Sequence, residues 1–140
     1  MPLFADLAAM QARFEERDLI QLTDEAGAGV IDAARIDQVL TSSDALITGY
    51  VAARHRDTAA LAGHAILTDI ACDYALSLLW RSDAPEWVRD RRKLAIEQLT
   101  KISSGVIKLD QGEEQAAPRP GQILTSGPER RFSRDSLAGF

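Results

Sequence analysis

The residues from Gln21 to Arg35 have the spacing of a calcium-binding EF-hand loop. In that pattern Asp24 is the first ligand, Gly29 lies at the sharp turn and Asp32 takes the ninth position. Calcium prefers six to eight oxygen ligands. Here alanine stands at the third and fifth positions, and Arg35 stands where a bidentate glutamate would close the site. The loop therefore keeps the spacing of a calcium site and lacks most of its ligands.

The structural interpretation of the same loop is a turn that leads into a helix. Glycine adopts positive φ angles without strain, and an aspartate before a helix accepts hydrogen bonds from its first free N–H groups. We therefore expect Asp24, Gly27, Gly29 and Asp32 to form a structural turn and helix cap, and we predict no metal and no cofactor. A small regulatory or calcium-responsive binding module remains the alternative function.

A second set of titratable side chains invites a metal or acid–base interpretation. Asp69 and Asp73 are four residues apart and share a helix face, but His64 is five residues before Asp69 and points elsewhere. His55 has no evident partner in the sequence, and no nucleophile elbow or H-E-x-x-H pattern occurs. We assign no catalytic residues and do not expect an enzyme; a solvated face or helix cap is the favoured interpretation.

The elements that must position these side chains are helices. No segment shows a sustained two-residue alternation of apolar and polar residues, and residues 106–109 are the only plausible strand, a short one. Four segments instead carry apolar residues at helical spacing: Leu3 to Phe14, Asp32 to Val51, Ile66 to Leu79, and a last one that starts within Ser82 to Glu86 and stops near Gly105. The third has the widest apolar surface, so we expect it at the centre. The sequence predicts an all-α fold, a compact bundle of about four helices.

The last of these helices carries the side chains whose roles are hardest to assign. Trp80 and Trp87 flank the corner that precedes it, and we expect both to be packing anchors. The basic run 89–93 spreads around the helix, leaving Leu94 and Leu99 for the core. Because the chain is acidic overall, contact with an adjacent subunit is a better interpretation of this run than contact with DNA.

Length and composition limit the class of protein. The chain has 140 residues, 46% of them hydrophobic, which suits one globular domain. Its net charge of -5 disfavours a general nucleic-acid binder. The single cysteine, Cys72, lies in an apolar run and fits a reducing compartment. The longest uncharged run is far shorter than the roughly 20 residues of a membrane span, and no secretory signal is evident. We expect a soluble intracellular product without a membrane partner.

The chain divides into a helical body, 1–105, and an extended C-terminal arm, 106–140. Residues 110–140 contain three of the five prolines and little aliphatic periodicity, which is typical of a tail or linker. Its end interleaves arginines with phenylalanines, side chains that concentrate binding energy at interfaces. We predict that the partner-binding residues are Arg130, Arg131, Phe132, Ser133, Arg134, Asp135, Leu137 and Phe140.

Several short motifs, in order, resemble one protein family. They are Gln21-Leu-Thr-Asp24, Gly27-x-Gly29-x-Ile31-Asp32, Gly49-Tyr-Val-Ala-Ala-Arg54, Asp69-Ile-Ala-x-x-Tyr74, Ile102-x-x-Gly105 and Arg131-Phe-Ser-Arg-Asp-x-Leu137. Together they resemble the small neck protein of Mu-like phages and prophages, and the resemblance covers the chain from about Leu7 to Phe140. That family is itself similar to the helical head–tail connectors, or head-completion proteins, of long-tailed phages.

The resemblance implies a structural role in the virion. The protein would form a homo-oligomeric ring of about twelve copies below the portal, with packaged DNA passing through its lumen. It would act as an adaptor that offers a docking surface to the tail, with the portal protein and a tail-side neck protein as partners. The C-terminal arm would anchor to the portal or to neighbouring neck proteins. Its location would be the virion neck, reached from the host cytoplasm during assembly.

Overall fold

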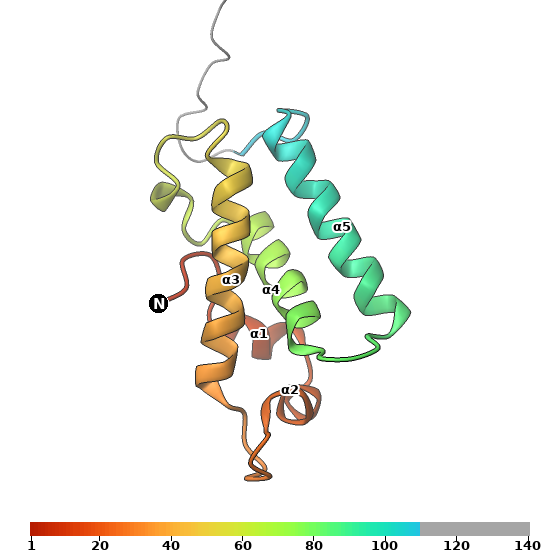
Figure 1. Cartoon of the computed structure of the whole chain (residues 1–140). Coiled ribbons are helices and arrows are strands. Elements are labelled where there is room, and N and C mark those ends of the chain that lie inside the picture. Colours follow the sequence, from red (N-terminus) through yellow and green to blue (C-terminus); the bar gives the residue numbers. More distant parts are fainter. Residues whose placement is uncertain (110–140) are drawn as a thin grey trace, which may run out of the picture.

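The computed structural model describes residues 1–109, which form five α-helices and one short 3₁₀ helix (Figure 1). Their bounds in chain order are α1 Leu7–Arg13, α2 Glu16–Thr23, α3 Ala33–Val51, η1 Ala59–Leu61, α4 Ala65–Leu79 and α5 Glu86–Ser103. The described residues contain no strand. The predicted all-α class is therefore confirmed.

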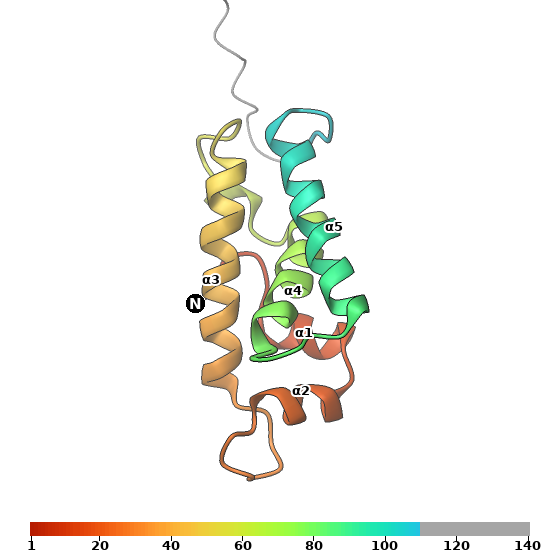
Figure 2. The same cartoon turned by 45° about the vertical axis from the view of Figure 1, so that its right-hand side comes forward.

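Three long helices, α3, α4 and α5, pack together and form most of the body (Figures 1 and 2). The helix α4 contacts both α3 and α5, and α1 packs against α4 and α3. Figure 2 shows α1 and α2 near the end of the bundle where α3 and α5 begin. The opposite end carries the last turns of α3 and α5 and the residues that follow each of them.

The helix boundaries follow from local capping chemistry. The Asp6 carboxylate accepts a hydrogen bond from the backbone N–H of Ala9 at 2.8 Å and so caps α1. Pro85 precedes α5, and Glu86 places an acid in its first turn. Gly105 follows α5 with a φ of 79°, the left-handed conformation that commonly ends a helix.

The core confirms that the third predicted segment is central. Seven of the fifteen residues of α4 are buried, and they face helices on both sides. The largest fully buried side chains come from every helix and from η1: Met10, Leu19, Ile36, Leu40, Ile47, Leu61, Leu67, Ile70, Leu76, Leu79, Leu99 and Ile102. One continuous cluster therefore holds the body together through apolar burial.

The prediction of about four helices missed α2. Its first turn, Glu16 to Asp18, is wholly charged, and its eight residues leave little room for an apolar repeat. Leu19 nevertheless is fully buried, so tertiary packing stabilises this short helix. A further difference concerns Leu3, which lies outside α1 because Asp6 begins that helix.

The predicted short strand at 106–109 is wrong. The backbone N–H groups of Val106 and Ile107 both donate to the carbonyl of Lys101, at 2.9 and 3.1 Å, which closes the end of α5 in a turn. No neighbouring strand exists among residues 1–109 to pair with this segment. Leu109 is buried in the core cluster, so the body includes residues beyond Gly105. Residues 110–140, most of the predicted arm, lie outside the described part.

Within residues 1–109, none of the helices combines the length and the apolar character needed to cross a membrane.

Candidate functional site

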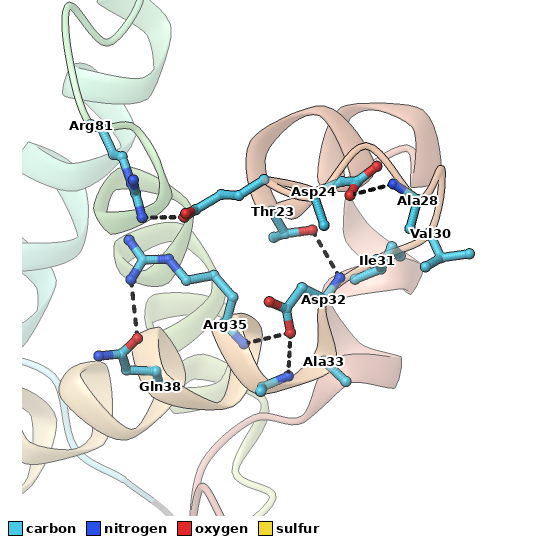
Figure 3. Close-up of a pocket in the computed structure, with 13 residues that line it drawn as sticks. Thr23, Asp24, Ala28, Val30, Ile31, Asp32, Ala33, Arg35, Gln38 and Arg81 are labelled. Atoms are coloured by element: carbon cyan, nitrogen blue, oxygen red, sulfur yellow. Dashed lines mark hydrogen bonds and ion pairs between the residues drawn. The ribbon is translucent and has the colours of Figure 1, made fainter.

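The loop between α2 and α3 is closed on its own aspartate (Figure 3). One carboxylate oxygen of Asp24 accepts the N–H of Ala28 at 2.9 Å, and the other accepts the N–H of Gly29 at 2.6 Å. These backbone hydrogen bonds lower the pKa of Asp24, and the bond from Gly29 has the largest effect. Gly27 and Gly29 both have a φ of 72°, the conformation that glycine adopts without strain. Backbone donors thus occupy the carboxylate that would be the first calcium ligand.

Asp32 links the loop to the helices on either side. Its carboxylate accepts the N–H groups of Ala34 at 3.0 Å and Arg35 at 3.2 Å, which caps α3 as predicted. Its own N–H donates to the hydroxyl of Thr23 at 3.1 Å, and that hydroxyl donates to the carbonyl of Leu19 at 2.8 Å. The structural role expected for the loop is what its geometry provides.

The loop borders an open cavity of about 730 Å³ (Figure 3). Arg81, just after α4, forms an ion pair with Glu25 and connects the loop to the end of α4. The Arg35 guanidinium donates a hydrogen bond to the side-chain oxygen of Gln38 at 3.0 Å. Val30 is 61% exposed on the loop. No nucleophile–base pair lines the cavity.

Residues 1–109 contain no group of three or more histidine, cysteine or acidic side chains placed to hold a metal ion. The absence of a bound metal in this protein stays a prediction. We expect the melting temperature to stay within about 1 °C when calcium is added to millimolar concentration, because a ligand stabilises a fold only if it binds the folded state. A parallel magnesium titration controls for ionic strength, and an upward shift at micromolar calcium would restore the calcium-responsive alternative.

Asp69 and Asp73 form a charged network across three helices. Asp73 on α4 accepts hydrogen bonds from Arg13 on α1 at 3.2 Å and from Arg91 on α5 at 2.9 Å. Asp69 forms an ion pair with the same Arg13. His64 occupies the N-cap position of α4, before the turn that carries Asp69. The two carboxylates hold helices together, in place of the free solvated face that the sequence suggested.

Two arginines of the basic run on α5 lie against aromatic rings. The guanidinium of Arg91 lies 5.8 Å from the ring centres of both Phe14 and Trp87, and that of Arg92 lies 5.4 Å from the ring of Tyr74. Both distances allow cation–π attraction. Arg89 and Lys93 are exposed to solvent.

Two expectations for α5 are wrong. Leu94 and Trp87 are each 50% exposed, whereas Leu99 is buried as predicted. The core takes Val88, Ala95, Leu99 and Ile102, so Trp87 and Leu94, seven residues apart, share a different face. Two apolar sets on one helix are visible in the sequence, but spacing alone does not tell which of the two sets faces the core.

Two of the motifs that carried the family resemblance meet in space. The Arg54 guanidinium donates to the carbonyls of Ser103 at 3.2 Å and Ser104 at 3.1 Å, so the chain after α3 caps the end of α5. It lies over Gly105, where an added Cβ would overlap with it. Sequence spacing alone gives no sign of this contact.

Asp44 on α3 is a buried carboxylate that fixes the N-terminal segment. It accepts the backbone N–H of Leu3, and that of Phe4 at 3.3 Å. Burial raises the pKa of Asp44, although these hydrogen bonds act in the opposite direction. Burial likewise raises the pKa of the Cys72 thiol to about 11, so this thiol is protonated at neutral pH and is not a reactive nucleophile.

The Asp44 carboxylate predicts a pH dependence of stability. The pKa of Asp44 is higher in the folded state than in the unfolded state. At a pH between the two pKa values the folded state therefore binds more protons, and stability falls as the pH rises from about 4 through the folded pKa. Asp44→Asn should remove this fall, an effect of about 1 kcal/mol or less. Melting curves from pH 4 to 7 test it against Asp37→Asn, an exposed position on the same helix. Parallel curves for wild type and Asp44→Asn would contradict the assignment.

The predicted partner-binding residues, Arg130 to Phe140, lie outside the described residues, and their role stays a prediction. The four residues of the predicted turn are brought together by the loop, as described above.

Comparison with known proteins identifies a family for the chain. A family model described as Bacteriophage Mu, Gp36 matches residues 4–125. A comparison with curated proteins gives no match. The matched span includes all six helical segments of the described fold, the loop at Asp24 and the contact between Arg54 and the end of α5.

Proposed function

Because the chain belongs to the bacteriophage Mu Gp36 family, whose model covers most of its length, we propose that it is a structural protein of the virion and acts as a head–tail connector. In this role copies of the chain form a ring below the portal and give the tail its docking surface. The helical body supplies the contacts between neighbouring copies, and the C-terminal arm anchors the ring to the portal or to other neck proteins.

The observation that carries this proposal is the uncovered apolar face of α5. Leu94 and Trp87 are half exposed on a helix whose core contacts are made by a different set of residues, Val88, Ala95, Leu99 and Ile102. Large apolar side chains surrounded by charged ones are typical of protein interfaces. Here the side chains three or four residues from Leu94 include Asp90, Arg91 and Glu97, all exposed. A face of this kind suits contact between subunits better than contact with water.

The charges beside this face also favour a protein partner. Arg91 and Arg92 are held by aromatic rings, and Arg91 also by Asp73, which leaves fewer cations of the run open to a phosphate backbone. The chain as a whole is acidic. An acidic protein with both signs of charge on one helix is suited to complementary contacts between copies.

The arm adds binding strength through repetition. A ring carries one arm for each copy, so many weak contacts act together and bind firmly. Arginine and phenylalanine at the end of the arm are among the side chains that dominate interface energies.

Light scattering on the purified chain, with and without portal protein, tests this function. We expect assemblies much larger than one chain, formed at lower protein concentration when portal is present. Leu94→Lys should weaken assembly by roughly tenfold or more, since it places a charge in the centre of the contact. Thr100→Lys, an exposed position on another face of α5, is the matched control. A chain that stays monomeric even with portal contradicts the proposal.

A further inference from the structure

A second recess lies near the start of α5, distinct from the cavity beside the Asp24 loop. This groove has a volume of about 390 Å³, and its apolar wall includes Phe14, Leu22, Trp80 and Trp87. It thus combines side chains from the turn between α1 and α2, from α2 itself, and from the corner between α4 and α5. The indole N–H of Trp80 is buried and lacks an acceptor within residues 1–109, so the described chain leaves this wall incomplete.

The groove is already built to hold an arginine between aromatic rings. Arg91 lies 5.8 Å from the ring centres of Phe14 and Trp87, and its guanidinium is fixed by Asp73 at 2.9 Å. Trp87 is nevertheless half exposed. Its ring can therefore accept a further aromatic or cationic side chain.

The charge left open at this groove is negative. Arg13 and Arg91 line it, but both are paired with acidic side chains of α4. Glu15 lines it without an ion-pair partner among residues 1–109. Asp18 has only an exposed contact with Arg17 at 3.9 Å, which is a weak interaction. An occupant that carries both arginine and an aromatic ring would match the groove in charge and in shape.

We propose that the occupant is the segment Arg130–Leu137 of a neighbouring copy of this chain. Its sequence, Arg-Arg-Phe-Ser-Arg-Asp-Ser-Leu, offers three arginines to the acidic rim and Phe132 to the aromatic wall. This proposal rests on the connector function, because it names what joins one subunit of the ring to the next.

The position of Leu109 supports a neighbouring copy, and not the same copy, as the chain that supplies the segment 130–137. The described residues end at Leu109, shortly after α5 ends at Ser103, and the N–H of Ile107 still bonds to Lys101 in the last turns of α5. The groove is instead lined by Pro85, Trp87 and Arg91 at the start of α5, and Figure 1 shows that the two ends of this helix lie at opposite ends of the bundle. A segment attached at one end of a subunit and a receptor surface at the other end form a head-to-tail pair, the kind of contact that generates rings. The 20 residues between Leu109 and Arg130 extend to roughly 66 Å, enough to reach an adjacent body.

Binding of a labelled peptide to the full-length chain tests the proposal. The probe is a fluorescein-labelled peptide of residues 128–140, followed by anisotropy at a chain concentration too low for assembly. Both tryptophans of the chain line the groove, so their emission provides a second readout. We expect saturable binding that Phe132→Ala in the peptide weakens by roughly tenfold or more. A peptide of the same composition in reversed order is the control.

Charge reversal locates the binding site. Glu15→Arg with Asp18→Arg in the chain should weaken binding severalfold, and Arg130→Glu with Arg131→Glu in the peptide should restore it at least in part. Asp37→Arg, an exposed acid on α3, is the control for general charge effects. Equal effects of the groove variant and the Asp37 variant would overturn the proposal.

Two other outcomes also overturn it, and they are distinguishable from failure of the connector function. If the peptide does not bind while light scattering still detects rings, the groove is not the receptor and the connector function stands. If Phe132→Ala in the full-length chain makes the groove bind the peptide roughly tenfold more tightly, the segment normally occupies its own body and the neighbour assignment is wrong.

Discussion

Deletion of residues 132–140 is expected to lower the yield of infectious particles by roughly 100-fold or more, because each copy in the proposed ring would lose the phenylalanine and arginine side chains that we propose as its anchor. The loss of about 2 kcal/mol at one interface side chain weakens one contact roughly 30-fold. In a ring the same loss is repeated in every copy. We therefore expect DNA-filled heads that fail to join tails, counted by plaque assay and by electron microscopy of the lysate.

The control for this deletion keeps the length of the arm and changes a part that contains neither arginine nor phenylalanine. Replacement of residues 111–117 by a glycine–serine stretch of equal length should leave the yield within a few fold, because those residues lack the arginine–phenylalanine pattern. The melting temperature of the deleted chain should match that of wild type, since residues 1–109 form their own core. Normal yield after deletion would remove the docking role of the arm.

Gly105→Ala is expected to destabilise the fold by about 2–4 kcal/mol, the largest effect we predict for a single small substitution. Gly105 has a φ of 79°, where a Cβ costs about 1–2 kcal/mol. The added Cβ would also overlap with the guanidinium of Arg54. The guanidinium moves more easily than the backbone, so we expect it to shift away from the added Cβ. It would then lose its hydrogen bonds to the carbonyls of Ser103 and Ser104, which is the second part of the cost.

Gly49→Ala is the matched control, and its expected effect has the opposite sign. Gly49 is an exposed glycine within α3, and nothing lies within 4 Å of an added Cβ there. Alanine in a helix interior should stabilise the fold by about 0.5–1 kcal/mol. Urea unfolding of both variants measures the difference. Equal stabilities for the two would show that the contact between Arg54 and Gly105 does not hold the end of α5 in place.

The fold class was predictable because helical periodicity is strong in the long elements. The α3, α4 and α5 segments each carry apolar residues along a core-facing stripe, and their caps at Asp32 and Gly105 follow known local chemistry. The short helix α2 was not predictable in the same way, because its stability depends on the burial of Leu19 against the rest of the body.

The turn at Asp24 was predictable in role and not in detail. Missing oxygen ligands already argued against calcium, but only the structure shows the carboxylate bound to the N–H groups of Ala28 and Gly29. The groove was not predictable, since it joins Phe14, Trp80 and Trp87 from three separate segments. Trp87 has the large apolar side chain that is typical of a packing anchor. Sequence spacing does not reveal that its ring faces an open groove.

The ion pairs of Arg13 and Arg91 were not predictable from the sequence for the same physical reason, their dependence on tertiary packing. Each arginine finds its acidic partner on another helix, at Asp69 and Asp73, and pairings between helices depend on packing and not on local spacing. The family motif around Asp69 is thereby explained as part of the network that joins α1, α4 and α5.

Cryo-electron microscopy of tailed particles that contain this protein tests the connector function directly. We expect a ring between portal and tail in which each subunit fits the five helices of residues 1–109, with the segment 130–137 in the groove of the next subunit. Particles whose neck contains no density that fits this helical body, while the protein is present elsewhere in the virion, would contradict the connector function.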